Sequence, residues 1–576
     1  MSHTPSFDAK LQALLAATVP GERVCPISGD RWMLTQEEID RCRAWGVPPS
    51  PYAPTMRLKL LAASAAGVDL WWRPHAFTQK PILCSSDPDA LASVVTDDEW
   101  YALDDGSTHS IDASLDQPFF EQYLALIPQI PMQANYSSAS ENCIGGGFEK
   151  CVNGFMVFGS FTLQDCWYTF RSKSDERCMD VAFVAYSQDS FACCMADRLH
   201  GCTQVFDSLD CINSQFLFDA RDCENCFCST NLRRRKYVFM NEQLTQDEYE
   251  RRMDEIDLSC SSVFEKWKQT FHGLLKSQAV WPETFSINSP ECVGDYLLNC
   301  LESSGWYMDD ARDVRGGWMV FGQSSHSESI VVARSAQDAY MSAGVLGSQN
   351  VKFSLVSKDS TSLEYCNNCR DCENCFGCHS LRSKKFHIFN KPYSEEEYWK
   401  TVDALKCAML DRGEYGKWFP PAVSNWRPET GFASVVSPLT AEEIARLGLA
   451  PFDPKAAMRF APVSNQPAGN LGDVPDCINQ VGAEWAGIPF DDVEQGRRFN
   501  ISSREIDYRK DRHYPFPKSH YRGRLVELVR QINGPETESR VCGKCQKMLV
   551  VNKNPMFPDR TIYCMDCFYV FIDSRG

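Results

Sequence analysis

The chain has few of the residues from which active sites are commonly built. It contains ten histidines in 576 residues, and neither a glycine-rich phosphate loop nor a recognisable Ser/His/Asp pattern is present. Positive charge is also in deficit, with 58 Lys and Arg against 76 Asp and Glu and a net charge of −18. This balance excludes a surface that is basic throughout, as a general nucleic-acid binder would need, although it allows a local basic site.

Long apolar runs are absent as well. No stretch approaches the roughly 20 residues that span a bilayer, and the first residues lack the basic and apolar regions of a signal peptide. We therefore expect a cytoplasmic protein with no membrane partner. Hydrophobic residues make up 43% of the chain, so it can bury substantial cores, and its length favours roughly three to five domains.

Cysteine, by contrast, is abundant, with 28 residues. In a long chain without a secretory signal, this content indicates free buried thiols and metal ligands rather than disulfides. The clearest ligand set is two CxxC pairs separated by 18 residues: Cys542, Cys545, Cys564 and Cys567. This spacing predicts a zinc ribbon that binds one structural zinc ion, because four thiolates leave no open position for catalysis.

Two internal repeats organise the rest of the chain. Residues 222–249 match residues 371–398 at a shift of 149, with 12 of 28 residues identical. Each copy ends in a Ser/Thr-x-x-Glu capping box, which predicts closing helices over 245–275 and 394–411. A more distant repeat relates residues 29–100 to 496–567 at a constant shift of 467.

Upstream of the first closing helix, small residues recur at near-constant spacing. Cys166, Cys178, Ser190, Cys202, Cys211 and Cys223 are separated by 12, 12, 12, 9 and 12 positions. Short strands at regular spacing, broken by polar turn residues, are typical of stacked-strand repeats. We therefore predict a β-helix (solenoid) with two such spacings per coil, or 22–24 residues.

The predicted fold class is mainly β with flanking helices, in which duplicated β-helix units are framed by zinc-ribbon-like modules at both termini. The predicted domains are a degenerate zinc-ribbon-like module (1–62), a metal-free ribbon twin and linker (63–134), β-solenoid unit 1 with its closing helix (135–280), β-solenoid unit 2 with its closing helix (281–415), a connector (416–490), a second degenerate module (491–537) and the zinc ribbon (538–576).

The N-terminal copy of the ribbon lacks the four ligands. His75, Thr78, Asp97 and Trp100 stand at the aligned positions, and Trp cannot bind a metal. We expect packing to replace the ion in this twin. A mixed site built on His75 and Asp97 is the alternative.

A run of five cysteines at every third position, Cys366 to Cys378, allows two interpretations. It has some likeness to iron–sulfur ligation, and a second metal site or redox thiols are further alternatives. The repeat favours a core role instead, since the shift of 149 places Leu217 and Ala220 opposite Cys366 and Cys369. Small core residues can be exchanged in this way, whereas metal ligands cannot.

Two basic segments are candidate binding surfaces for nucleic acid or a partner. The first is the run Arg233, Arg234 and Arg235, which either prevents edge-to-edge aggregation or binds phosphate or acidic groups. The second, residues 496–530, is rich in Arg and Tyr and contains Arg497, Arg498, Arg522 and Arg524. It is either an RNA-binding surface beside the ribbon or a docking face for protein.

These motifs together resemble a known group of proteins. The terminal pattern G-x-x-[WF]-x-[LI]-x3-E-[IL]-D, the repeated DCENCF ends and the closing CxxC pairs resemble a family of large, uncharacterised, cysteine-rich zinc-ribbon proteins of candidate-phyla bacteria. The terminal modules also resemble a probable zinc-ribbon domain with further cysteine pairs. Here only Cys25 remains of those pairs, with residues 53–57 at the second pair and Asp492 and Gln495 in the C-terminal copy. The resemblance implies that both of these sites are empty, and it implies no activity.

The sequence therefore favours a non-catalytic scaffold or adaptor that binds protein partners, with homo-oligomerisation secondary. An RNA- or ribosome-associated factor using residues 496–530 and the ribbon is the first alternative. A β-helix enzyme is the second, with Asp189 and Asp338 as repeated acidic residues on one face. Aspartates at such corners commonly satisfy turn backbone instead.

Overall fold

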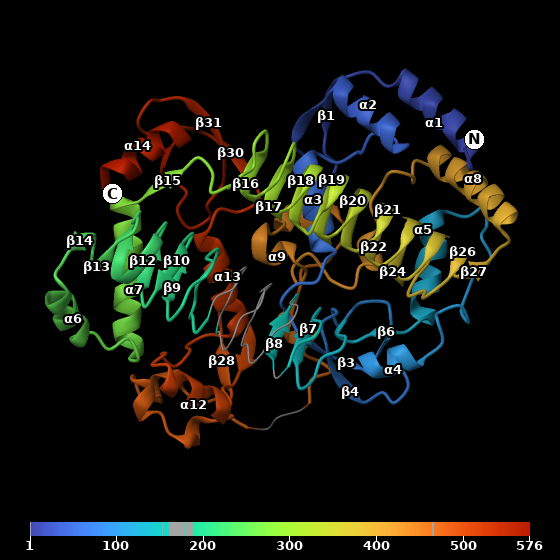
Figure 1. The fold of residues 1–576 in the computed structure, drawn as a ribbon. Coiled ribbons are helices and arrows are strands. Elements are labelled where there is room, and N and C mark those ends of the chain that lie inside the picture. Colours follow the sequence, from blue (N-terminus) through green and yellow to red (C-terminus); the bar gives the residue numbers. More distant parts are fainter. Residues whose placement is uncertain (1, 153, 160–178, 180–187, 463–465, 576) are drawn as a thin grey trace. The chain divides into compact units, whose positions relative to one another are not determined.

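The computed structural model describes residues 2–152, 154–159, 179, 188–462 and 466–575. These residues form two compact units, each built from two distant stretches of chain (Figure 1). Unit 1 comprises Met1–Asn135 and Ser286–Phe452, and unit 2 comprises Tyr136–Phe285 and Asp453–Gly576. The N-terminal module thus belongs with the second repeat copy, and the C-terminal module with the first.

The chain is mainly β with flanking helices, as predicted. In unit 1, the N-terminal module contains α1 (Pro5–Ala17), β1 (Gly21–Val24), β2 (Arg31–Leu34), α2 (Gln36–Trp45), α3 (Pro54–Ala63), β3 (Trp71–Pro74), β4 (Pro81–Cys84), β5 (Val94–Val95), α4 (Asp97–Ala102), α5 (Phe119–Leu126) and β6 (Met132–Gln133). The rest of unit 1 contains β16 (Val293–Leu298), β17 (Ser304–Asp309), β18 (Arg312–Phe321), β19 (Ser325–Arg334), β20 (Gln337–Leu346), β21 (Gln349–Lys352), β22 (Leu355–Lys358), β23 (Thr361–Glu364), β24 (Asn367–Arg370), β25 (Glu373–Phe376), β26 (Lys385–Ile388), β27 (Lys391–Pro392), α8 (Glu395–Asp411), α9 (Ala433–Val436) and α10 (Ala441–Arg446).

Unit 2 repeats this plan. Its first stretch contains β7 (Ile144–Gly146), β8 (Phe155–Phe158), β9 (Thr203–Phe206), β10 (Leu209–Ile212), β11 (Gln215–Phe218), β12 (Arg221–Thr230), β13 (Lys236–Phe239), β14 (Glu242–Gln243), α6 (Gln246–Asp254), α7 (Ser261–Gln278) and β15 (Val280–Pro282). Its C-terminal module contains α11 (Pro454–Ala457), the short 3-10 helices η3 (Leu471–Asp473), η4 (Ile478–Gln480) and η5 (Ala483–Trp485), β28 (Phe490–Asp492), β29 (Arg497–Phe499), α12 (Ser503–Asp511), α13 (Tyr521–Gln531), β30 (Thr537–Val541), β31 (Met548–Asn552), β32 (Thr561–Tyr563) and α14 (Met565–Arg575).

The strands before each closing helix form a parallel ladder, which we call the first ladder in unit 2 (β7–β13) and the second ladder in unit 1 (β16–β26). Paired residues lie 12 positions apart over most of both ladders, as in Glu224 with Lys236 and Glu373 with Lys385. The offset is 11 at the start of the second ladder and 13 between β18 and β19. The predicted 22–24 residues per coil is therefore wrong by about a factor of two. Cys166 and Cys178, on which part of that prediction rested, lie outside the described residues.

A left-handed backbone conformation recurs at every third residue along much of both ladders. In the first ladder it includes Asp207, Asp210 and Asn213, with φ of 51°, 53° and 46°. Asp and Asn tolerate this conformation better than most residues. Each twelve-residue step is thus built from four short segments, and each segment bends at a left-handed residue. This local geometry explains why polar turn residues are so frequent between the short strands.

Serine and cysteine side chains line the interior of these steps. The Ser354 hydroxyl donates to the Lys352 carbonyl at 2.9 Å and accepts from the Cys366 N–H, twelve residues later, at 3.1 Å. Cysteines occupy similar positions and donate to the carbonyl two residues earlier, as Cys366 does to Glu364 at 3.5 Å. A small side chain that can donate a hydrogen bond fits this place, so the two residue types exchange between steps.

The cysteine run of the second ladder lies in the apolar core, as the repeat predicted. Cys366, Cys369, Cys372, Cys375 and Cys378 pack with residues such as Val351, Leu363 and Leu381. Burial raises the pKa of the Cys366 and Cys369 thiols well above the ordinary value. The thiols of Cys366 and Cys369 are therefore neutral, space-filling groups.

The two ladders agree in register at the shift of 149. Val238 pairs with Gln243 in a terminal antiparallel turn, and His387 pairs with Pro392 in the same place. The closing helices differ. The single helix predicted over 245–275 is wrong, because α6 and α7 are separate helices, whereas α8 matches the helix predicted over 394–411. No helix among the described residues is both long and apolar enough to cross a bilayer.

The start of α7 is tied to the C-terminal module. Cys260 and Cys477 form a disulfide, which corrects the expectation that the cysteines are only free thiols and metal ligands. Beside it, the Asp476 carboxylate accepts the Ser262 N–H at 2.9 Å. That carboxylate satisfies one of the free N–H groups in the first turn of α7, which Cys260 cannot do.

The terminal modules also agree with each other, at the shift of 467. The β3–β4 hairpin pairs Trp71 with Cys84, and the β30–β31 hairpin pairs Glu538 with Val551. At the same shift, β5 pairs in parallel with β6, and β32 pairs in parallel with β15.

Candidate metal centre

Four cysteines converge at the end of the β30–β31 hairpin, which we call the ribbon hairpin. Cys542 and Cys545 lie in the turn between the strands, where the Cys542 N–H donates to the Lys547 carbonyl at 2.9 Å and the Gln546 N–H to the Cys542 carbonyl at 3.0 Å. Cys564 follows β32, and Cys567 lies in the first turn of α14. All four sulfur atoms lie within 4.8 Å of one another, so the group could hold a metal ion.

The separations of the sulfur atoms fit a small tetrahedral ion. Bonds of about 2.3 Å to a tetrahedral ion place its sulfur ligands about 3.8 Å apart. Cys545 Sγ and Cys564 Sγ are 3.7 Å apart. The Cys564 N–H also donates to Cys542 Sγ at 3.3 Å, in the manner of a hydrogen bond to a thiolate.

The surrounding backbone favours the ionised form of Cys542. Burial alone would raise the pKa of its thiol, but hydrogen bonds from the backbone of Cys545, Cys564 and Lys544 lower it to about 6. A thiolate is the form that binds a metal ion. The donor set therefore suits a cation with a preference for sulfur.

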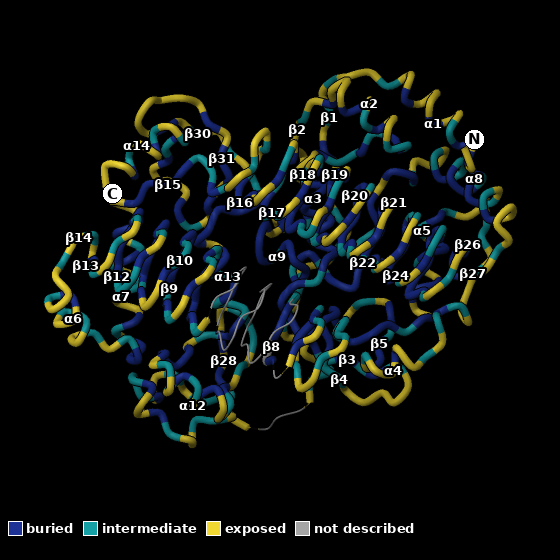
Figure 2. Tube along the Cα trace, in the orientation of Figure 1, coloured by how far each residue is buried: buried dark blue, intermediate teal, exposed yellow. Residues whose placement is uncertain are grey.

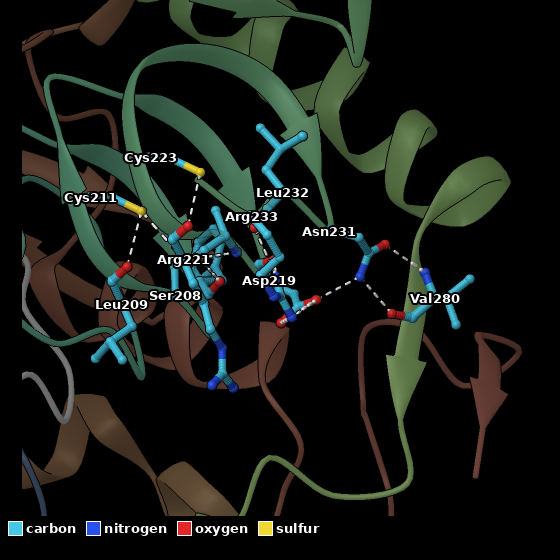
Figure 3. A network of polar contacts seen from close by, with 12 residues as sticks. Ser208, Leu209, Cys211, Asp219, Arg221, Cys223, Asn231, Leu232, Arg233 and Val280 are labelled. Carbon is cyan, nitrogen blue, oxygen red and sulfur yellow. Dashed lines mark hydrogen bonds and ion pairs between the residues drawn. The ribbon is translucent and has the colours of Figure 1, made fainter. Parts of the chain in front are cut away.

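Unit 2 positions this centre through a polar network at the end of the first ladder (Figure 3). The Asn231 amide exchanges two hydrogen bonds with the Val280 backbone, at 2.9 and 3.0 Å, and donates to the buried Asp219 at 2.8 Å. Arg233 completes the network with an ion pair to Asp219 at 2.9 Å. Because Val280 begins β15 and β15 pairs with β32, the network fixes the strand that leads into Cys564.

Burial makes the charges of Asp219 and Arg233 in this network depend strongly on each other. It raises the pKa of Asp219 above its ordinary value even though Arg233 opposes the shift. A buried carboxylate that loses its cation is strongly destabilising. Sequence inspection missed Asp219 and Asn231, since neither belongs to a ligand motif.

Unit 1 contains the neutral counterpart of this network. Asn368 and Ser380 stand at the positions of Asp219 and Asn231, and their side chains lie 2.9 Å apart. Asn368 also exchanges hydrogen bonds with Gln133 of β6 at 2.9 and 3.2 Å. Strand β6 pairs with β5, which leads to Asp97, the residue aligned with Cys564.

In the N-terminal twin, hydrogen-bonded and packed side chains stand at the four aligned positions. His75 replaces Cys542, and its Nδ1 lies 3.2 Å from the Thr78 N–H, while its Nε2 contacts the Glu99 carboxylate at 2.7 Å. Asp97 accepts the Asn135 N–H at 2.9 Å. Trp100 is buried, and the Arg382 guanidinium lies 4.3 Å from the centre of its ring.

Side chains at the degenerate cysteine positions also accept hydrogen bonds. Asp492 accepts N–H groups from Gln495 at 3.0 Å and His520 at 2.8 Å. At the aligned position, burial raises the pKa of the Cys25 thiol, but hydrogen bonds from Ser28, Ala53 and Ile27 lower it overall. A side chain that accepts backbone N–H groups thus stands at this turn in both modules.

The basic run at 233–235 does not form one exposed patch. Arg233 is paired with Asp219, and Arg235 donates to the carbonyl of Arg575 at the end of α14 at 2.6 Å. Arg234 is exposed. Two of the three side chains thus hold parts of unit 2 together.

The predicted basic surface at 496–530 is also partly engaged within the module. Arg498 pairs with Asp491 at 2.7 Å, and Arg522 donates to the Gln495 side chain at 3.3 Å. Arg524 donates to the Ser519 carbonyl, and Arg497 is half-buried.

Other chemical groups in the described residues are less complete. Asp257, Cys260 and Cys477 form the second group of three close metal-ligating side chains there, but two of them share a disulfide. Asp189 and Asp338 both occupy left-handed backbone positions, with φ of 48° and 51°. Asp189 pairs with Arg512, and Asp338 pairs with His326.

Comparison with known proteins adds no assignment. No protein-family model and no curated protein sequence matches this chain.

Proposed function

We propose that the chain is a non-catalytic adaptor that assembles protein partners, with the ribbon hairpin as one docking element. The ion at the cysteine centre is zinc, one per chain, and its role is structural. Closing a hairpin with four thiolates contributes on the order of 10 kcal/mol to folding. The two ladders are β-helical stacks of twelve-residue coils, and the protein acts in the cytoplasm.

The exposed apolar face of the ribbon hairpin is the observation that carries this proposal. Val541, Met548 and Val550 are 48%, 65% and 62% exposed. The tube of β30 and β31 carries exposed stretches (Figure 2). Within the described residues, β31 pairs with no strand other than β30, so no strand covers its outer edge, where the Asn552 carbonyl accepts a hydrogen bond from Arg560. An apolar edge strand held rigid by a metal is suited to pairing with a partner strand.

The metal-free twin lacks this property. At the shift of 467, Pro81 stands where the ribbon hairpin has Met548, at the equivalent register position. Proline has no N–H to donate and therefore blocks an edge. Of the two aligned hairpins, the ribbon hairpin is thus the one without a proline at this edge position.

Affinity purification of the full chain from its native cell, followed by mass spectrometry, tests this function. Met548→Pro copies the residue of the twin and should abolish the capture of strand-pairing partners without loss of the metal. Val493→Asp, at a residue that is 90% exposed in another turn of the module, should leave capture unchanged.

The same affinity purification also tests the alternative function, an RNA- or ribosome-associated factor. Salt-dependent capture of RNA, lost when Arg497, Arg498, Arg522 and Arg524 are reversed in charge, would replace the adaptor proposal. If wild type and Met548→Pro capture the same set of proteins, the ribbon hairpin is not a docking element of the adaptor.

A further inference from the structure

Unit 2 contains an open pocket of about 340 Å³ beside the first ladder, which we call the Thr203 pocket. It lies between strands β9 and β11 of the ladder, the start of α7 and the turn that follows α12. Its apolar wall includes Phe191, Leu258 and Phe264, and its polar lining includes Thr203 and Gln215. A pocket with these walls can hold a small molecule or a single side chain that has an apolar stem.

The second ladder fills the equivalent place with a lysine. At the shift of 149, Thr203 and Gln215 correspond to Lys352 and Glu364. Thr203 pairs with Gln215 on adjacent strands, and Lys352 pairs with Glu364 in the same way. The two places are therefore equivalent in strand register as well as in sequence. Unit 1 has a long cationic side chain where unit 2 has a short hydroxyl.

The amino group of this lysine is held by the turn that follows α2. Lys352 Nζ donates a hydrogen bond to the carbonyl of Trp45, the last residue of α2, at 2.7 Å. Burial lowers the pKa of Lys352, and the nearby Glu364 carboxylate opposes this shift. Unit 1 thus shelters an amino group at this place. At the shift of 467, Trp45 corresponds to Arg512 in the turn beside the Thr203 pocket.

The backbone of that turn is repeated in unit 2. The Val47 N–H donates to the Cys42 carbonyl at 3.0 Å, and the aligned Tyr514 N–H donates to the Arg509 carbonyl at 2.9 Å. The Arg512 carbonyl is therefore placed like its counterpart in unit 1, and Arg512 lines the pocket. Among the residues that the structure describes, none donates a hydrogen bond to this carbonyl. Unit 2 thus repeats the acceptor of unit 1 without the lysine that uses it.

The charges around the Thr203 pocket favour a cation. Asp189 and Asp511 supply two carboxylates to its lining, which also includes Arg512 and His513. The Arg512 guanidinium is paired with Asp189 at 2.9 Å, so its charge is compensated. The carboxylate of Asp511 adds a negative charge at the pocket and attracts an ammonium group.

We propose that the Thr203 pocket binds a ligand that carries a primary alkylammonium group. The ammonium nitrogen takes the place that Lys352 Nζ has in unit 1 and donates a hydrogen bond to the Arg512 carbonyl. The alkyl chain lies against Phe191 and Phe264. The pocket contains no residue of the ribbon hairpin, so this inference goes beyond the proposed adaptor function and does not depend on it.

The probe is n-butylamine, whose chain has the length of a lysine side chain. It is titrated into the full-length protein at about pH 7.5, where an alkylamine is protonated, and its binding is followed by saturation-transfer NMR. We expect a dissociation constant on the order of millimolar for so small a ligand. 1-Butanol lacks the charge and butyltrimethylammonium lacks the N–H donors, so each should bind at least about tenfold more weakly.

Three variants resolve the site. Thr203→Lys copies the residue of unit 1, fills the pocket and should abolish binding of n-butylamine. Ile212→Lys adds the same charge at a residue of the same ladder that is 42% exposed and does not line the pocket, and it should leave binding unchanged. Asp189→Asn removes the partner of the Arg512 guanidinium and should weaken binding about fivefold. Thermal melting of each variant confirms that it remains folded.

Several results would overturn the inference. These are no binding of n-butylamine by the wild-type protein, equal binding of 1-butanol, or unchanged affinity in Thr203→Lys. Nα-acetyl-lysine N-methylamide then distinguishes the sources of the ammonium group. Binding at least as tight as that of n-butylamine assigns the pocket to a lysine side chain of a partner protein, whereas weaker binding assigns it to a free amine. Both of these results support the alkylammonium site.

Discussion

The Ser and Cys residues inside the ladders share a small side chain and the ability to donate one hydrogen bond. Ser342 and Cys369 lie inside different steps of the second ladder, and each donates to the carbonyl two residues earlier. Loss of a thiol from one repeat copy is thus tolerated whenever another small side chain takes its place. This is why the internal repeat predicted a core role for the cysteine run, whereas its spacing taken alone resembled a cluster site.

The four cysteines of the metal centre cannot be exchanged for other small side chains, because a metal ion needs all four as ligands. We predict about one zinc ion per chain by elemental analysis of the purified protein, and a large loss of bound zinc in Cys564→Ser. Cys369→Ser is the matched control from the ladder and should retain the full metal content. Bound iron, or a fall in metal content for Cys369→Ser, would show that the core interpretation of the ladder is wrong.

His379 gives the fold a specific dependence on pH. Burial lowers its pKa to about 4, and within the described chain neither ring nitrogen has a hydrogen-bond partner. The unfolded chain has a histidine pKa of about 6.5, so between about pH 6.5 and pH 4 it binds more protons than the folded chain. The contribution of His379 to stability is complete above this window and falls by about 3 kcal/mol as the pH drops to about 4.

Urea denaturation at a series of pH values measures this effect. His379→Gln should flatten the pH dependence of the unfolding midpoint between pH 6.5 and 4. His109→Gln, at an exposed histidine of the same unit, should leave it unchanged. An identical pH dependence in wild type and His379→Gln would contradict the assignment.

At the scale of elements, the twelve-residue step is the feature that sequence analysis only half predicted. The spacing of Ser190 and Cys202 shows the period. How many periods separate paired strands depends on how sharply the backbone bends between them, and left-handed residues such as Phe216 and Val332 lie at these bends. Their side chains do not signal such a conformation, so the coil length could not be derived from the pattern.

Val332 offers a direct test of this backbone geometry. It has φ of 57°, which is unfavourable for a β-branched residue. Val332→Asn should therefore raise the free energy of unfolding by about 1 kcal/mol. Val331→Asn, at the adjacent buried residue outside the left-handed set, should lower it by several kcal/mol, on the order expected for an unsatisfied buried amide. Thermal melting distinguishes the two, and a stabilising Val331→Asn would contradict the geometry.

The junction between α7 and the C-terminal module is a second test at this scale. The hydrogen bond with Ser262 lowers the pKa of Asp476, so its carboxylate is ionised where it caps the helix. Asp476→Ala should cost about 1 kcal/mol of stability, as for the loss of a helix cap. Asp473→Ala, at an exposed acid of the same segment, should be neutral by thermal melting. Equal effects would mean that Asp476 does not cap α7.

For the whole molecule, duplication explains more than any single site. Sequence comparison at the shift of 467 predicted which residues replace the metal ligands in the N-terminal twin, and His75 and Trp100 lie where the alignment places them. The grouping of each terminal module with the ladder that is farther from it along the chain was not predictable. It depends on contacts such as Cys260 with Cys477, 217 residues apart, for which no local pattern exists.

We propose that a metal ion holds one terminal module and that packing holds its twin. Hydrogen exchange of the full chain, with and without a strong zinc chelator, measures both modules at once by mass spectrometry. We predict that chelation accelerates exchange across residues 537–575 and leaves residues 71–102 and 366–378 protected. Unchanged exchange at 537–575, or lost protection at 366–378, would contradict the account.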